Sequence, residues 1–188
     1  METRTSISHP IGVNWAEGPD GHRIGLTFAP GKKDVSKVGA YRWERDLAED
    51  LDRLVALHRT TVLACLVEEH ELHTLGIPDL EAEAWRRGIA MRRLPIPDGG
   101  TPVDRAALQV FVLGLAAAVR QGEGVVIHCR GGLGRTGLVA GCTLVELGLT
   151  PAQALDAVKA ARGPSCPETE AQRAYVRAYT AAPMAIPS

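Results

Sequence analysis

A cysteine and an arginine, Cys129 and Arg135, stand six positions apart around a glycine-rich segment. A thiolate is a strong nucleophile, and a cysteine beside a cation or a helix N-terminus loses its proton more readily than a free one. The arginine side chain offers a planar pair of donors that matches two oxygens of a phosphate. The pair therefore predicts attack by the Cys129 sulfur on a phosphate ester that Arg135 holds.

The residues around this pair are typical of a loop that binds an anion. Glycines let a short loop turn its backbone N–H groups toward one point, where they form an anion-binding nest. A helix predicted over 133–147 would direct its N-terminus, with partial positive charge, at the same point. The Thr136 hydroxyl is expected to donate to the sulfur as the thiolate departs. The residues expected to bind the phosphate are Arg130, Gly131, Gly132, Leu133, Gly134 and Thr136, with His128 in support.

Two other interpretations fit part of this pattern. The glycines of the segment 132–137 match the GxGxxG fingerprint of dinucleotide-binding sites. That fingerprint requires a second strand ending in an acidic residue about 20 positions further on, whereas Gly148 and another predicted helix stand there. The second alternative is that Cys129 is an inert buried cysteine. It leaves the histidine, the arginine and the threonine around the loop unexplained, so we favour the nucleophile.

Ester hydrolysis also needs a group that protonates the departing oxygen. Asp98 stands in the glycine-containing loop 95–100, just after a strand predicted over 90–94 that we expect beside the Cys129 strand. The alternative for Asp98 is an ordinary turn residue, because Asp-Gly is a strong turn signal. Asp104 is a second carboxylate, but its place in the first turn of a predicted helix accounts for it. We therefore select Asp98 as the general acid.

The elements along the chain predict an α/β fold. Strands that alternate with helices indicate a mostly parallel central sheet with helices on both faces. The first ten or so residues are polar and predicted to be loose. We expect one domain over 1–188, with a core from about 11 to 180 and loose termini. The predicted strands are 11–15, 24–28, 61–67, 90–94 and 125–129, and the predicted helices are 36–58, 68–75, 78–87, 101–120, 133–147, 151–162 and 168–180.

Composition argues against several classes of partner. The chain has 188 residues and a net charge of −1, so no basic excess indicates nucleic-acid binding. No apolar run approaches the roughly 18 residues of a membrane span, and the N-terminus lacks the apolar stretch of a signal peptide. We expect a cytoplasmic monomer that binds neither nucleic acid nor a membrane.

Other polar and sulfur groups were weighed as sites. His70 and His73 lie three positions apart among glutamates and could share a metal, but a solvated polar turn is the interpretation we adopt. Cys65 lies on a predicted buried strand, and either fills the core or forms a reversible disulfide with Cys129. We favour the core. Cys142, in the helix after the loop, is expected to pack, and the four cysteines show no zinc-ligand spacing.

Together these residues resemble the signature HCxxGxxR[ST] of the cysteine-based protein tyrosine phosphatase superfamily. An aspartate about 30 positions before the cysteine resembles the dual-specificity branch. The segments 95–102 and 127–135 are similar to those of kinase-associated phosphatases, and the resemblance extends over about 23–180. It implies a mostly parallel sheet of four or five strands with helices on both sides, and no metal or other cofactor.

The resemblance also implies roles. Cys129 would be the nucleophile, Arg135 the phosphate clamp and Asp98 first the acid and then the base. Some relatives carry a glutamine motif in the last helix that positions the hydrolytic water. Here only Gln172 can carry this role, and a solvated helix face is the alternative. Arg130 either favours anionic substrates or is simply solvated.

The substrate stays open at this point. The leading hypothesis is a phosphoprotein phosphatase that acts on phosphotyrosine, on phosphoserine and phosphothreonine, or on all three. The alternatives are a small-metabolite or nucleotide phosphatase of the same fold and a non-catalytic phosphoprotein-binding module. The absence of lysines between Cys129 and Arg135 argues against a phosphoinositide.

Overall fold

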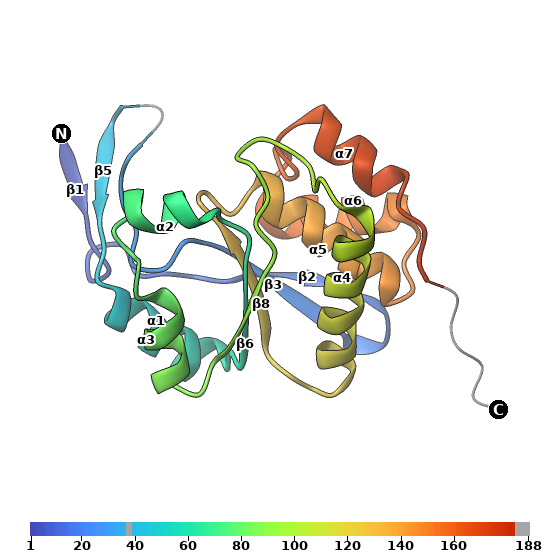
Figure 1. Cartoon of the computed structure of the whole chain (residues 1–188), viewed down its shortest axis with the longest axis horizontal. Helices are drawn as coiled ribbons and strands as arrows, with labels where there is room; N and C mark the ends of the chain where they lie inside the picture. The colour runs from blue at the N-terminus through green and yellow to red at the C-terminus, as the bar shows by residue number, and fades with distance from the viewer. Residues whose placement is uncertain (37–38, 183–188) are drawn as a thin grey trace.

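The computed structural model describes residues 1–36 and 39–182, and its centre is a five-stranded sheet (Figure 1). The strands are β2 (Asn14–Glu17), β3 (Arg23–Phe28), β6 (Val62–Cys65), β7 (Ala90–Arg93) and β8 (Val125–Cys129). They lie in the order β2-β3-β8-β6-β7, with β2 antiparallel to β3 and the other pairs parallel. The predicted α/β class with a mostly parallel sheet is confirmed.

β8 occupies the middle of the sheet because its side chains suit burial on both faces. All five of its residues are buried, as is typical of a parallel strand covered by helices on both sides. In register, Cys129 lies opposite Phe28 of β3, and His128 lies opposite Cys65 of β6. Cys129 therefore ends the central strand at the carboxyl edge of the sheet, where α/β folds place their sites.

One predicted strand neighbour is wrong. The strand over 90–94 was expected beside the Cys129 strand, but β6 lies between β7 and β8. β6 is apolar and buried throughout, which suits an inner position. β7 carries Arg92 and Arg93 and alternates between exposed and half-buried residues, which suits the edge of a sheet.

Helices cover both faces of this sheet (Figure 1). They are α1 (Leu47–His58), α2 (Glu69–Thr74), α3 (Leu80–Arg86), α4 (Arg105–Arg120), α5 (Gly134–Glu146), α6 (Pro151–Arg162) and α7 (Glu170–Arg177), with one 3-10 turn, Pro19–Gly21. α1 and α3 lie on one side, and α4, α5 and α6 lie on the other. Every residue of α5 is buried because α5 packs against β3, β8 and three helices. Within the described ranges, no helix is both long and apolar enough to cross a membrane.

A second sheet of three strands stands at the end of the molecule that carries the N-terminus (Figure 1). Its order is β1 (Glu2–Arg4), β5 (Tyr41–Glu44), β4 (Lys33–Val35). Two predictions are wrong here, because β1 lies in the segment expected to be loose and the helix predicted over 36–58 begins only at Leu47. Residues 41–44 alternate between half-buried and exposed, which is the period of a strand. Asp46 caps α1, since its carboxylate accepts the Glu49 N–H at 2.9 Å.

A capping residue also moves the start of α4, which begins at Arg105 and not at Pro102. The Asp104 carboxylate accepts the N–H groups of Ala106 and Ala107 at 2.9 and 3.1 Å, so Asp104 is the N-cap. The other predicted helices and strands differ from the structure by at most three residues at either end. Residues 37–38 of the predicted helix, and 183–188 of the end predicted to be loose, lie outside the described residues.

A fully buried ion pair joins the second sheet to the first. Arg45 follows β5, and its Nε and Nη2 each donate to an Asp50 carboxylate oxygen at 2.7 Å. Asp50, on α1, also accepts the Gly31 N–H at 2.8 Å, and Arg45 Nη1 donates to the His9 carbonyl at 2.8 Å. The Arg45 guanidinium also lies over the Phe28 ring, 4.9 Å from its centroid. One pair of charges thus fixes α1, the segment before β2 and the loop between β3 and β4.

We predict that Asp50→Ala lowers the free energy of unfolding by about 3–5 kcal/mol, because it leaves the buried Arg45 charge without its partner. Urea denaturation followed by circular dichroism measures this. The matched control is Asp52→Ala on the same helix, whose exposed ion pair with Arg87 is worth at most about 1 kcal/mol. Equal losses in the two variants would contradict a structural role for the buried pair.

Candidate active site

The loop after β8 wraps around the Cys129 sulfur. The Gly132 N–H donates to Cys129 Sγ at 3.3 Å, and Cys129 is only 3% exposed. Gly132 has a φ of +72°, and a Cβ there would lie 2.4 Å from the Thr27 carbonyl oxygen, so this position requires glycine. α5 begins at Gly134 and turns its N-terminus toward the loop. The predicted order of strand, loop and helix is confirmed. The dinucleotide alternative requires a further strand after β8, but in the part of the chain that the structure describes only helices follow.

Arg135 lies at the base of this loop with 1% exposure. Its Nη1 and Nη2 donate to the two Glu71 carboxylate oxygens at 2.6 and 2.9 Å, and Nη1 also donates to the Ile96 carbonyl at 2.9 Å. Burial disfavours the charge, but the Glu71 hydrogen bonds and the nearby Cys129 and Asp98 charges outweigh it and raise the pKa of Arg135 above its ordinary value. Arg135 Nε is buried and makes no hydrogen bond within the described residues. The guanidinium therefore keeps a donor for an oxyanion.

The structure brings Asp98 to Arg135, although β7 and β8 are not neighbours. The loop after β7 crosses the end of β6, where the Ile96 N–H donates to the Leu66 carbonyl at 3.0 Å. Asp98 then accepts from Arg135 Nη2 at 2.9 Å, with its side chain 42% exposed. Asp104 does not line the cavity and acts as the N-cap of α4. Of the two candidate carboxylates, the geometry therefore favours Asp98.

The second sheet forms one wall of the site. Arg130 donates to both Asp34 carboxylate oxygens, at 2.9 and 2.6 Å, and so joins the loop to β4. Arg130 is half-buried, so the alternative of a simply solvated arginine is wrong. From the other side, Arg162 of α6 donates to the Gly132 and Gly131 carbonyls at 3.0 and 3.1 Å. Arg162 thus holds two carbonyls of the loop, which leaves the N–H groups of the same peptide units to face the other way, into the loop.

These groups enclose a cavity of about 470 Å³. Its floor is the loop with Cys129 and Arg135, and its walls carry three aromatic side chains, five further charged residues and the Asp98 loop. A cavity with a sulfur nucleophile, inward N–H groups and a buried guanidinium suits an oxyanion bound to a larger group. The wall residues are Phe28, Lys32, Asp34, Val35, Ser36, Tyr41, Trp43, Asp98, Gly99, Arg130, Gly131, Leu133, Gly134, Arg162 and Glu168.

Comparison with known proteins identifies the family of this chain. The family model "Swiss Army Knife protein, DSP-PTPase phosphatase domain" matches residues 43–186. Cyclin-dependent kinase inhibitor 3 of Sus scrofa is 35% identical over 160 residues, which are 83% of this chain and 71% of the relative. The chain belongs to the dual-specificity branch of the protein tyrosine phosphatases.

One structural likeness is to a kinase associated phosphatase. A solved structure of that protein, with its catalytic cysteine substituted by serine, matches this phosphatase with a TM-score of 0.79 at 29% identity. The match covers 89% of this chain and 93% of that chain. Cyclin-dependent kinase inhibitor 3 of Rattus norvegicus is 36% identical over 111 residues, 58% of this chain, and the alignment spans only 52% of the relative.

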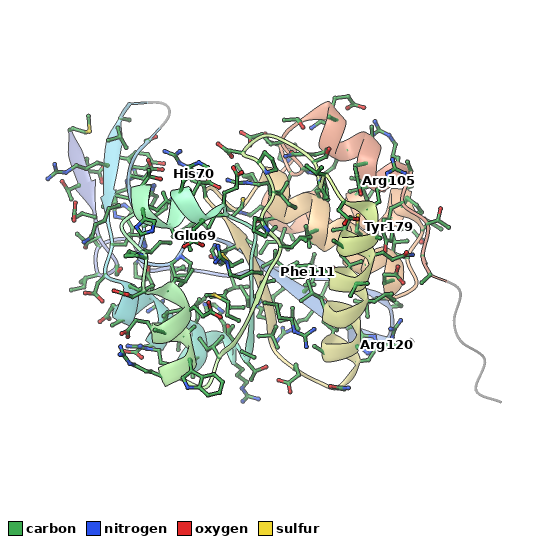
Figure 2. The ribbon with its side chains drawn as sticks, in the orientation of Figure 1. Glu69, His70, Arg105, Phe111, Arg120 and Tyr179 are labelled. Carbon is green, nitrogen blue, oxygen red and sulfur yellow. The ribbon has the colours of Figure 1, made fainter. Side chains whose placement is uncertain are left out.

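Glu71 is one site residue of this phosphatase that sequence analysis missed. It stood among glutamates interpreted as a solvated turn, and its neighbours Glu69, His70 and His73 are indeed exposed. Figure 2 labels Glu69 and His70 on this helix. Glu71 is instead buried, and it also accepts the Glu68 N–H at 2.9 Å. Burial raises its pKa, but the Arg135 hydrogen bonds outweigh this and hold the pKa below its ordinary value. The Glu-x-x-Glu spacing of a capping box was the available signal.

Gln172 is buried, so the alternative of a solvated helix face is wrong. Its Oε1 accepts the Thr169 N–H at 3.0 Å, and its Nε2 donates to the Gly100 carbonyl at 3.0 Å. A Cβ on Gly134 would lie 2.7 Å from Gln172 Oε1, so α7 packs closely against the start of α5. Gln172 therefore connects the loop that carries Asp98 to the loop between β8 and α5, residues 130–133, which we call the phosphate loop after its predicted ligand. Contact with a hydrolytic water stays a prediction.

Four other candidate residues differ in their surroundings and hydrogen bonds. His128 is buried, and burial lowers its pKa to about 4, so the ring stays neutral behind the loop. Thr136 is buried, but its hydroxyl makes no hydrogen bond in the described chain, and the expected donation to the Cys129 sulfur is not present. Cys65 lies in the core opposite His128, and burial raises its pKa to about 11, which fits a core residue. Cys142 is also part of the core.

We predict that Glu71→Ala lowers turnover of an aryl phosphate about 10²-fold, because Arg135 loses the partner that fixes its position. Steady-state kinetics with p-nitrophenyl phosphate measures this. Glu69→Ala is the matched control on the same helix, since Glu69 is exposed and bonds Arg93 on the surface. The idea fails if the two variants are equally active.

Proposed function

We propose that this phosphatase hydrolyses phosphorylated side chains of proteins through a phosphocysteine intermediate. The observation that carries the proposal is the convergence of Cys129, Arg135 and Asp98 on one cavity. The sulfur, the guanidinium and the carboxyl come from three segments, and two of them are joined by the Arg135–Asp98 contact at 2.9 Å. We propose that residues 1–188 act as one phosphatase domain without a metal.

Phosphate binding would use the donors of the loop. Backbone N–H groups from Arg130 to Arg135 would receive the three non-bridging oxygens, and the Arg135 Nε donor would complete the set. These contacts strengthen as charge spreads over those oxygens in the transition state. The bound dianion would also compete for the Arg135 donors that now contact Asp98. Beside that dianion the protonated form of Asp98 is favoured, as a general acid requires.

The proposed reaction has two steps. In the first, the Cys129 thiolate attacks phosphorus, the phosphorus–ester oxygen bond breaks, and Asp98 gives its proton to the departing alcohol or phenol. In the second, water attacks phosphorus, the sulfur–phosphorus bond breaks, and the Asp98 carboxylate takes a proton from the water. Phosphate leaves, and the thiolate and the protonated acid are restored.

Phosphoprotein substrates are proposed from the family and the cavity. The solved relative is named kinase associated phosphatase, and a cavity of about 470 Å³ with open aromatic walls accommodates a side chain larger than a phosphate alone. We also propose that the enzyme works in the reducing cytoplasm, where its four free cysteines would stay thiols. A panel of phosphotyrosine, phosphoserine and phosphothreonine peptides beside nucleotides and sugar phosphates separates this proposal from the metabolite alternative.

We predict that Cys129→Ser abolishes turnover of p-nitrophenyl phosphate, because a serine hydroxyl in the loop is a far weaker nucleophile than a thiolate. The assay is complemented by rapid acid quench and ³¹P NMR of the wild-type protein, which should reveal phosphorus bound to sulfur. The buried Cys142→Ser is the control and should keep its turnover. Full activity of Cys129→Ser would refute the mechanism.

We predict that Asp98→Ala lowers the rate by about 10²–10⁴-fold for a substrate with a poor leaving group. The loss should shrink for a phenol that departs without a proton, so a series of aryl phosphates measures the effect. Asp104→Ala removes the other candidate carboxylate and should cost only about 1 kcal/mol of stability through its cap. A larger rate loss in Asp104→Ala than in Asp98→Ala would move the acid to Asp104.

A further inference from the structure

Lys32 is a buried cation in the wall of the active-site cavity that the mechanism above does not use. It follows Gly31 in the loop between β3 and β4, and its side chain lines the cavity that contains Cys129. The residue is only 5% exposed. A buried ammonium group is costly unless other groups stabilise its charge, so its partners are informative.

The partners of Lys32 position its charge without neutralising it. Its Nζ donates to the Arg130 carbonyl at 3.1 Å, and it lies 4.9 and 5.2 Å from the ring centroids of Phe28 and Trp43. Carbonyl oxygens and aromatic faces attract a cation but carry no net charge. Among the described residues Lys32 makes no ion pair, because both oxygens of nearby Asp34 are taken by Arg130.

The backbone around Lys32 is held from several sides. The Arg45 N–H donates to the Lys32 carbonyl at 3.3 Å, and the next residue, Lys33, donates its N–H to the Leu75 carbonyl at 2.8 Å. The Phe28 and Trp43 rings stack with centroids 5.4 Å apart. The ammonium group therefore has a fixed place beside the phosphate loop.

Burial and four nearby charged groups shift the pKa of Lys32. Burial is the main effect and lowers its pKa to about 8, while Asp34 and Cys129 favour the charged form and Arg130 and Arg45 oppose it. A dianion in the cavity adds two negative charges, and like Asp34 and Cys129 these favour the charged form of Lys32. By linkage, an anion that favours charged Lys32 is itself bound more tightly by charged Lys32.

We propose that Lys32 is a further binding residue of the phosphate site. Its charge attracts the oxyanion from the cavity wall, and its bond to the Arg130 carbonyl keeps that end of the loop turned with its N–H groups inward. This proposal rests on the proposed function, since it assumes that an oxyanion occupies the loop. Its ligand class is a dianionic phosphate ester or a tetrahedral dianion of the same shape.

The pH dependence follows from the sign of the charge. Lys32 is charged below its pKa and neutral above it, so affinity for a dianion should be full at neutral pH and fall as pH rises through about 8. Sulfate is the probe because its own charge is constant in this range. Cys129→Ser is the common background because a serine hydroxyl does not titrate there. Since this background lacks the Cys129 charge that favours charged Lys32, its affinity should fall at a lower pH than that of the wild-type protein.

The experiment measures sulfate affinity by isothermal titration calorimetry between about pH 6 and about pH 10. In the Cys129→Ser background, adding Lys32→Met should weaken binding about tenfold at the low end of this pH range and remove the fall in affinity as pH rises. Lys32→Arg should bind well across the whole range, because arginine keeps its charge. The matched control is Lys33→Met, which removes the adjacent lysine whose side chain is 54% exposed. It should match the background.

Equal affinity in the Lys32→Met and Lys33→Met proteins at the low end of this pH range would overturn the proposal. A background protein that binds no sulfate at any pH would instead count against the proposed phosphate site itself. If Lys32→Met does not fold, NMR of lysine labelled at Cε in the wild-type protein decides. Sulfate should then raise the pH at which the Lys32 signal titrates, and an unchanged titration would refute the role. Lys32→Arg assigns that signal by its loss.

Discussion

The Arg135 guanidinium carries a charge that is almost entirely out of water, so protein groups must match its donors. Glu71 does so with both oxygens, and the Ile96 carbonyl and Asp98 take further donors. These partners come from two segments: Glu71 lies on α2, and Ile96 and Asp98 lie in the loop after β7. The need to satisfy one buried cation therefore holds these segments together at the carboxyl edge of the sheet. The position of the loop that carries Asp98 is a consequence of that requirement.

Local features allowed the phosphate loop to be predicted. A buried strand, glycines and an apolar helix follow one another within one segment, and each has its own sequence signal. The identity of Asp98 as the better carboxylate also followed, although through an adjacency of strands that is wrong. The loop crosses the end of β6 to reach the site, and periodicity does not reveal such a crossing.

Residues distant in sequence were harder to predict. Glu71 stands 64 positions from Arg135, in a run of glutamates of which Glu68 is half-buried and Glu69 is exposed. Lys32 stands 98 positions from the Arg130 carbonyl that it binds. The second sheet was missed because β1, β4 and β5 are short and carry mostly polar residues, so they lack the apolar runs that indicated the strands of the first sheet. For Glu71 and Lys32, the local sequence is that of a solvated charge, and only tertiary packing shows that the side chain is buried.

The outward carbonyls of the phosphate loop have a consequence for ligand capture. Lys32 and Arg162 bind the carbonyls of Arg130, Gly131 and Gly132, and the Cys166 thiol donates to the Leu133 carbonyl at 3.3 Å. Each of these peptide groups is thereby oriented before any anion arrives. The entropy of ordering the loop is then lost on folding and not on association, so more of the interaction energy remains as affinity. Such preorganisation places the dipoles where charge will develop, and no rearrangement is needed at the moment of reaction.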